Sequence, residues 1–310
     1  MSDAPAATPV ESPKPGVVGD SDDHAARHRT LVLLAVPALL AGALAGAPSL
    51  ETQLFLLAPL VAILGVPHGA LDWHIAARVW ALRSPSAHLG FAALYLGLAG
   101  ATLVLWLAAP TVGLASFLAY SAVHFADDWR GELPFAQRLA VGAGIVVLPT
   151  SAHAGEVAAI FGTLADPEGG AAIAAALDWI GLPLSVALIG IASAAARLAP
   201  RLALEIALLA LAAWVAPPLV FFVVYFCFVH SPRHFLNTTR ALGLELASGI
   251  KAAAPLTAVG LLGASAAAGA IWFSGLPQDV VILRTVFIGL AVLTVPHMLL
   301  VDHFRSRQNK

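Results

Sequence analysis

The chain has 310 residues, of which 59% are apolar and only 11% are charged. Soluble domains carry about 25% charged residues, so this composition excludes an ordinary soluble protein and predicts an integral membrane protein. The net charge is −2 with neutral histidines, which disfavours nucleic acid as a partner. The single cysteine, Cys227, excludes an intrachain disulfide.

Residues 1–29 are rich in Pro, Ala, Ser and Asp, which predicts a disordered tail before a single transmembrane helical domain at residues 30–310. A membrane-crossing helix needs about 20 apolar residues. The apolar runs predict an all-α bundle of about ten transmembrane helices, with eight or nine if the shortest runs do not cross. The runs cover residues 31–47, 54–76, 89–109, 111–126, 136–152, 179–197, 202–216, 218–236, 253–273 and 282–304.

The prolines and loops between the apolar runs refine the prediction of helices. Pro217-Pro218 predicts a tight hairpin between two helices, and the long loop 153–178 is expected to hold a short interfacial helix or a re-entrant turn. The first run has the small residues of a signal sequence. The polar stretch before it is too long and too acidic for one, so the run is predicted to remain as a membrane helix.

The basic residues orient the bundle. With both termini in the cytoplasm, every lysine and arginine except Arg284 falls in a cytoplasmic segment or at its edge. This bias favours the cytoplasmic membrane with both chain ends inside. Arg284 lies near the outer start of the last helix, where its side chain is expected to reach the interface.

Histidines gather at one depth. Helix C-termini attract histidine, which accounts for His74 and His303 but not for His68, His124 and His297, which lie a turn or more inside apolar runs. The sequence therefore predicts a metal site built from several imidazoles, with a proton relay or interhelical hydrogen bonds as alternatives. Seven histidines lie in the inner parts of four helices that run the same way: His68, His74, His124, His230, His234, His297 and His303.

One pair has the spacing of a shared ligand set. His230 and His234 are four residues apart, which puts both rings on one helix face about 6 Å apart. Neutral imidazoles suit Fe, Zn, Cu or Ni. Pro232 between them predicts either a kink or a new helix that starts with Ser231 as its N-cap.

Carboxylates near this depth are candidates to orient the histidines. Asp72 follows His68 by four residues, on the same helix face, and is expected to hold that ring or a neighbouring one. Glu205 lies at a similar depth. Asp127 and Asp128 fit this role and a solvated helix end equally well.

Four long segments carry a family resemblance. They read "GVPHGALD" (65–72), "AVHFADDW" (122–129), "APPLVFFVVYFCFVHSPRHF" (216–235) and "TVFIGLAVLTVPHMLLVD" (285–302). With them the chain resembles the Brp/Blh family of membrane β-carotene 15,15′-dioxygenases. Residues 1–47 lie outside the resemblance and are expected to have no catalytic role.

The resemblance implies a non-haem Fe(II) enzyme of the cell inner membrane that uses O2 to cleave the central double bond of β-carotene into two retinal molecules. It implies that His68, His124, His230 and His234 bind the iron. His297 is then a further ligand or orients one. A retinal-binding rhodopsin is the implied consumer of the product.

Two other classes use histidine-rich membrane helices. A di-iron desaturase or hydroxylase usually has several His-x-x-x-His or His-His clusters, whereas the membrane part of this chain has the single pair at 230 and 234. A metal or proton transporter needs polar residues at several depths. The outer half of this chain has few.

The depth of the histidines also predicts where the substrate lies. β-Carotene is about as long as the roughly 30 Å hydrocarbon core, and the histidines lie toward its cytoplasmic side. We therefore expect a tilted or in-plane tunnel that opens between helices to lipid, with walls near Phe125, Phe228 and Leu299.

Overall fold

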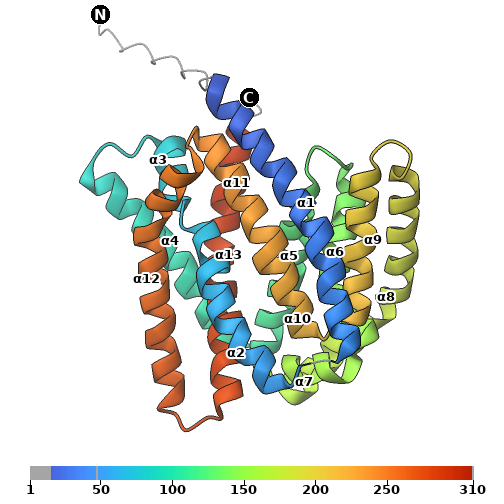
Figure 1. The fold of residues 1–310 in the computed structure, drawn as a ribbon. Helices are drawn as coiled ribbons and strands as arrows, with labels where there is room; N and C mark the ends of the chain where they lie inside the picture. The colour runs from blue at the N-terminus through green and yellow to red at the C-terminus, as the bar shows by residue number, and fades with distance from the viewer. Residues whose placement is uncertain (1–14, 47, 309–310) are drawn as a thin grey trace, which may run out of the picture.

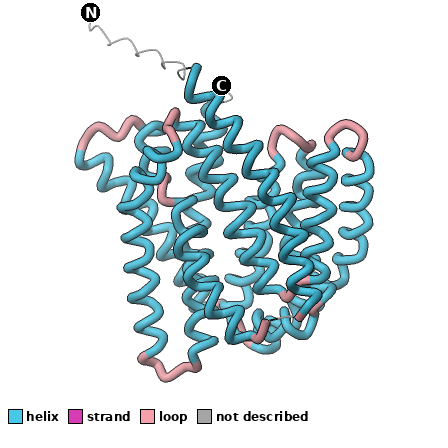
Figure 2. The backbone as a smooth tube through the Cα atoms, viewed as in Figure 1, coloured by secondary structure: helices cyan, strands magenta, loops and turns pink. Residues whose placement is uncertain are grey.

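The computed structural model describes residues 15–46 and 48–308, and almost all of them lie in helices that form one bundle (Figure 1, Figure 2). The α-helices are α1 (Pro15–Ala45), α2 (Leu50–Leu60), α3 (Asp72–Trp80), α4 (Pro85–Ala108), α5 (Pro110–Ala126), α6 (Phe135–Ala152), α7 (Ala154–Leu164), α8 (Pro167–Ala195), α9 (Pro200–Val215), α10 (Pro218–Val223), α11 (Ser231–Leu242), α12 (Leu246–Trp272) and α13 (Gln278–Gln308). Four short helices of other types join them: η1 (Val61–Gly65), η2 (Val66–Gly69), η3 (Asp127–Trp129) and η4 (Val224–His230).

The predicted all-α membrane class is confirmed, but the count of about ten spanning helices is not. Each predicted apolar run overlaps a helix. Within the described part of the chain, however, only 7 helical segments are long and apolar enough to cross a membrane. Three predicted runs are therefore not among them: α5 and α9 fall short with 17 and 16 residues, and α1, which covers the first run, is not one of the 7. The 7 segments are Leu50–Trp80, Pro85–Ala108, Phe135–Ala152, Pro167–Ala195, Pro218–Leu242, Leu246–Trp272 and Gln278–Arg305.

Local sequence signals fix most helix ends. Proline is the first residue of α4, α5, α8, α9 and α10, because the first N–H of a helix has no intrahelical acceptor to lose. The Ser84 hydroxyl and the Asp166 carboxylate cap α4 and α8 by accepting the N–H groups of Ala87 and Gly169. Gly243 ends α11 with φ 68°, a left-handed conformation that glycine adopts without strain.

Several predicted boundaries differ in the structure. Helix α1 begins at Pro15, so it includes residues 15–29 of the predicted tail, and residues 1–14 lie outside the described residues. The loop 153–178 contains α7, but α8 already begins at Pro167. The hairpin at Pro217 is present, between the end of α9 and the start of α10.

The first turn of α1 and the last turn of α13 lie at one end of the bundle, and the α3–α4, α5–α6, α8–α9 and α11–α12 connections lie there too (Figure 1, Figure 2). The arginines predicted to be cytoplasmic lie in or near these connections, in the first half of α1 or in the last turns of α13. Arg284 lies in the second turn of α13, which starts at the opposite end, and donates from Nε to the Thr163 carbonyl at 2.9 Å. A protein acceptor therefore holds the one arginine that breaks the charge bias. That the end with both termini faces the cytoplasm stays a prediction.

Two π-helical turns lead into the histidine segments. Turn η1 precedes His68, and η4 ends at His230. In an α-helix the N–H groups of residues 67 and 232 would bond the carbonyls four residues earlier, but both positions are proline and have no N–H. The wider turns accommodate this loss, and π-helical turns are frequent at functional sites.

Candidate metal centre

Five histidines from distant segments meet in the half of the bundle that contains both termini. His68 comes from η2, His124 from α5, His230 and His234 from the η4–α11 junction, and His297 from α13. Ring centroids of the contacting pairs lie between 4.6 and 6.4 Å apart. The predicted convergence of imidazoles at one depth is therefore present, and His297 belongs to it.

The cluster is largely shielded. His124, His230, His234 and His297 are at most 4% exposed, and His68 is half-buried. Buried imidazoles need partners for both ring nitrogens, because an unpaired polar atom inside a protein costs about 1–3 kcal/mol. The partners of each nitrogen therefore indicate what the cluster is built to hold.

Two of the rings are held by buried carboxylates. His230 Nδ1–H donates to Asp128, whose two oxygens lie 3.2 and 3.1 Å away, and His297 Nδ1–H donates to Asp72 Oδ1 at 2.7 Å. Each carboxylate is itself fixed by a phenol: Tyr225 donates to Asp128 at 2.7 Å, and Tyr95 donates to Asp72 at 2.8 Å. This pairing fixes the tautomer, so Nε2 of both rings carries a lone pair.

Two further rings use Nδ1 in the same way. His68 Nδ1 bonds the Gly65 carbonyl, the last residue of η1, and His234 Nδ1 lies 3.4 Å from the Thr238 hydroxyl one helical turn later. Four of the five histidines thus direct Nδ1 to the protein around them. Their Nε2 atoms remain for a shared partner.

The Nε2 atoms of the cluster lack hydrogen-bond partners other than one another among the described residues. Within the described part of the chain, Nε2 of His234 and of His297 are buried and have no hydrogen bond, while Nε2 of His124 and His230 lie 3.1 Å apart. In each of two overlapping groups, the ring nitrogens available as ligands lie within 4.8 Å of one another. Both groups are able to hold a metal ion. They are His68, His124 and His230, and His124, His234 and His297.

The carboxylates predicted to orient histidines are distributed differently in the structure. Asp72 holds His297 rather than His68, although His68 is closer in sequence. Glu205 has no hydrogen bond to a histidine among the described contacts. It is 0% exposed and accepts from Arg233 at 2.7 Å, Arg29 at 2.8 Å and the Trp129 indole at 3.1 Å.

The remaining histidines of the predicted group lie apart from the cluster. His74 is exposed, and the His303 ring stacks on Trp80 with the centroids 5.5 Å apart. His303 lies near the C-terminal end of α13, as expected, but His74 lies in the first turn of α3, so its predicted place at a helix C-terminus is wrong.

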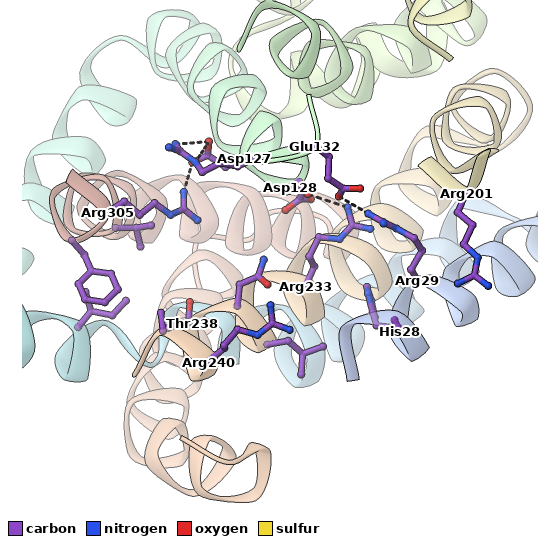
Figure 3. Close-up of a pocket in the computed structure, with 18 residues that line it drawn as sticks. His28, Arg29, Asp127, Asp128, Glu132, Arg201, Arg233, Thr238, Arg240 and Arg305 are labelled. Atoms are coloured by element: carbon purple, nitrogen blue, oxygen red, sulfur yellow. Dashed lines mark hydrogen bonds and ion pairs between the residues drawn. The ribbon is translucent and has the colours of Figure 1, made fainter. Parts of the chain in front are cut away.

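Sequence reasoning missed several residues around the cluster. Asp128 looked equally like a solvated helix end, yet it is 8% exposed and holds His230. The phenols of Tyr95 and Tyr225 carry no spacing signal. His28 and Arg29 belong to a segment that was expected to have no role in the site, and Figure 3 shows both beside Arg233.

Apolar cavities adjoin the cluster on two sides. One of about 290 Å³ reaches His68 and His297 from between α4, α12 and α13, and another of about 110 Å³ is lined by Phe125 and Tyr225. Of the predicted tunnel walls, Phe125 therefore lines a cavity. Phe228 and Leu299 are instead 41% and 49% exposed on the outside of the bundle.

Comparison with known proteins identifies related sequences. The model of a family described as β-carotene 15,15′-dioxygenase matches residues 59–305. A curated protein of that name, from the uncultured marine bacterium 66A03, is 32% identical over 267 residues, which cover 81% of this chain and 94% of the relative. No solved structure matches this chain.

Proposed function

This chain belongs to the β-carotene 15,15′-dioxygenase family, and from that premise we propose that it cleaves the central double bond of β-carotene with O2, at an iron(II) ion in the histidine cluster. His68, His124, His230 and His234 bind the iron, and His297 supplies a fifth imidazole to the same site. The products are two molecules of retinal. Their consumption by a retinal-binding rhodopsin stays a prediction.

The orientation of the Nε2 atoms carries this proposal. Asp128 fixes His230 as the Nδ1–H tautomer, so the Nε2 atom 3.1 Å from His124 carries a lone pair. Nε2 of His234 and of His297 have no hydrogen-bond partner among the residues that the structure describes. A cation in either of the two overlapping groups, which share His124, satisfies the lone pairs of three rings, and imidazole nitrogen is a suitable ligand for iron.

Iron(II), when bound, supplies the activation of O2. The protein's part is to hold the ligands and keep the site dry. The Tyr225–Asp128–His230 and Tyr95–Asp72–His297 chains prevent the rings from turning, and the carboxylates raise the basicity of the imidazoles. The walls that exclude water are apolar side chains such as Phe226, whose ring lies edge-on to His68 with the centroids 5.5 Å apart.

We also propose that the protein spans the cytoplasmic membrane with both termini inside. The support is the grouping of the arginine-rich connections at the end of the bundle where both termini lie (Figure 1). The candidate spanning helices supply an apolar surface for a lipid environment.

Expression in a bacterium that makes β-carotene tests the activity. We expect loss of orange colour and accumulation of retinal in aerated cells, and enzyme purified without oxygen should contain iron. Apocarotenals longer or shorter than retinal would contradict central cleavage. Zinc instead of iron in an active preparation would contradict the metal assignment, but it would not contradict the proposed cleavage of β-carotene.

A further inference from the structure

We propose that the 290 Å³ apolar cavity between α4, α12 and α13, here called the side cavity, holds one ring-bearing half of β-carotene and is the entrance for this substrate from the lipid. The proposal rests on the proposed function, since it names where the substrate of that reaction sits. It adds a binding site and a direction of entry.

The inner wall of the side cavity is the metal centre itself. His68 and His297 line it, together with Gly69. A Cβ at Gly69 would lie 3.6 Å from His297 Nδ1, so the backbone of η2 passes directly beside this ring. A polyene in the cavity therefore ends next to imidazoles of the cluster, as cleavage at its centre requires.

The outer mouth of the side cavity lies on the surface that faces the lipid. Leu96 of α4 and Val259 of α12 both line the cavity and are 69% and 63% exposed. Both helices are candidate membrane spans. A hydrocarbon can therefore pass from the bilayer into the cavity without crossing water, which would cost about 25 cal/mol per Å² of apolar surface.

The size and polarity of the side cavity fit half of the substrate. Small-molecule sites have volumes of about 300–1,000 Å³, so 290 Å³ is at the lower end and too small for the whole of a molecule as long as β-carotene. Three polar groups of the wall are paired with one another, because Tyr95 donates to Asp72 and Asp72 accepts from Nδ1 of His297. The surface offered to a ligand is thus mainly apolar, as an unsubstituted ring and polyene require.

Two positions allow the side cavity to be filled without touching the histidines. Ala92 lines it from α4, and the next residue, Ala93, is exposed and is not among the lining residues. Gly260 lines it from α12, where a Cβ would lie 3.3 Å from Val66 Cγ1, while Gly263, one turn on, has nothing within 4 Å. Each blocking position therefore has a matched control on its own helix.

The test compares Ala92→Phe and Gly260→Phe with Ala93→Phe and Gly263→Phe. We expect the first two to retain iron, to lower kcat/KM for β-carotene at least ~10-fold, and to lose β-carotene that co-purifies under anaerobic conditions, because a ring of this size fills the cavity. The two controls should stay within about twofold of the wild type, as surface changes usually do.

Wild-type kcat/KM and co-purification in both blocking variants would overturn the side cavity as the substrate site and leave the proposed function intact. Failure of the proposed function is distinguishable, because the wild-type protein would then bind no iron or produce no retinal. If one blocking variant loses iron, the other, on a different helix, decides the question.

A second, independent set of contacts concerns α1. We infer that His28 and Arg29 are positioning residues for the segment that carries His230 and His234, although α1 lies before the residues matched by the family, 59–305. His28 and Arg29 line a polar cavity of about 620 Å³ together with Arg233, Asp128 and Glu132. Figure 3 shows these side chains around the cavity.

His28 bonds a backbone carbonyl of the π-helical turn that lacks its usual α-helical donor. Pro232 has no N–H for the Phe228 carbonyl four residues earlier, and His28 Nε2 lies 2.9 Å from that carbonyl oxygen. Burial holds the pKa of His28 below its ordinary value, so the neutral ring donates this hydrogen bond. The bond fixes the backbone two residues before His230.

Arg29 acts through Glu205. It donates from Nε to Glu205 Oε2, and Arg233 donates to Oε1 of the same carboxylate at 2.7 Å. Arg233 lies between the two histidines of the pair and also reaches the Asp128 carbonyl at 3.4 Å. Arg29 thereby holds Glu205 in place. Glu205 in turn fixes Arg233, which bonds the backbone of Asp128, the residue that orients His230.

The test compares Arg29→Ala, Arg29→Lys and His28→Ala with Arg201→Ala, an exposed arginine that lines the same cavity (Figure 3). We expect Arg29→Ala and His28→Ala to lower kcat and iron retention about 10-fold, as changes to outer partners of metal ligands do, with an unchanged KM for β-carotene. Arg29→Lys should recover part of the loss. Arg201→Ala should match the wild type.

Wild-type kcat and iron retention in both Arg29→Ala and His28→Ala would overturn this role of α1. A KM that rises in parallel with the fall in kcat would do the same, because it indicates damage to the whole fold rather than to the metal ligands. The wild type measured beside them keeps this result separate from any failure of the proposed function.

Discussion

Replacement of His230 by alanine is expected to abolish β-carotene cleavage and to remove most of the bound iron. His230 is 0% exposed, contacts the rings of His68, His124 and His234, and is held by Asp128. The change deletes one imidazole from the ligand set and leaves a buried carboxylate without its donor, so both the site and its surroundings are lost. Retinal from a standard assay and iron per chain are the two measurements.

The surrounding residues give a graded series for comparison. Asp128→Asn keeps the shape but removes the charge that orients His230, and we expect a loss of about 10–100-fold in iron affinity or activity. His74→Ala, which changes an exposed histidine six residues after His68, should behave like the wild type. If His230→Ala kept full iron and full activity, the assignment of the metal centre would be wrong.

Replacement of Glu205 by alanine is expected to destabilise the fold by about 3–5 kcal/mol. The carboxylate is 0% exposed and accepts hydrogen bonds from two arginines and an indole. Without it, the buried Arg233 guanidinium keeps its charge but loses the partner that compensates for its desolvation. Thermal unfolding of the detergent-solubilised protein measures the effect, and Glu205→Gln should fall between alanine and the wild type.

Glu132 provides the control for this network, since it pairs with the same Arg29 at 2.6 Å but at the surface. The Glu132 and Arg29 side chains are 33% and 26% exposed, and solvent screens such a pair. Glu132→Ala is therefore expected to cost less than about 1 kcal/mol. Equal losses from Glu132→Ala and Glu205→Ala would show that burial does not decide the strength of these contacts.

The position of the histidines was predictable because membrane helices have little freedom in depth. Apolar runs fix how far a helix extends, and the arginines fix its direction, so His68, His124, His230 and His297 had to fall at one level. The number of crossings was less predictable. Helices α5 and α9 have 17 and 16 residues, and whether a helix that short crosses a bilayer depends on the helices packed around it.

What the sequence by itself determined is the all-α membrane class and the gathering of imidazoles toward the end of the bundle that holds both termini, because hydropathy and charge act along the chain. Only the tertiary structure decided the partners. Asp72 holds His297, 225 residues away, rather than His68, and Glu205 binds arginines rather than a histidine. Arg29 of α1 reaches the same buried carboxylate. Such pairings depend on how each helix is rotated about its axis and which helix lies beside it, and no spacing within one segment records either.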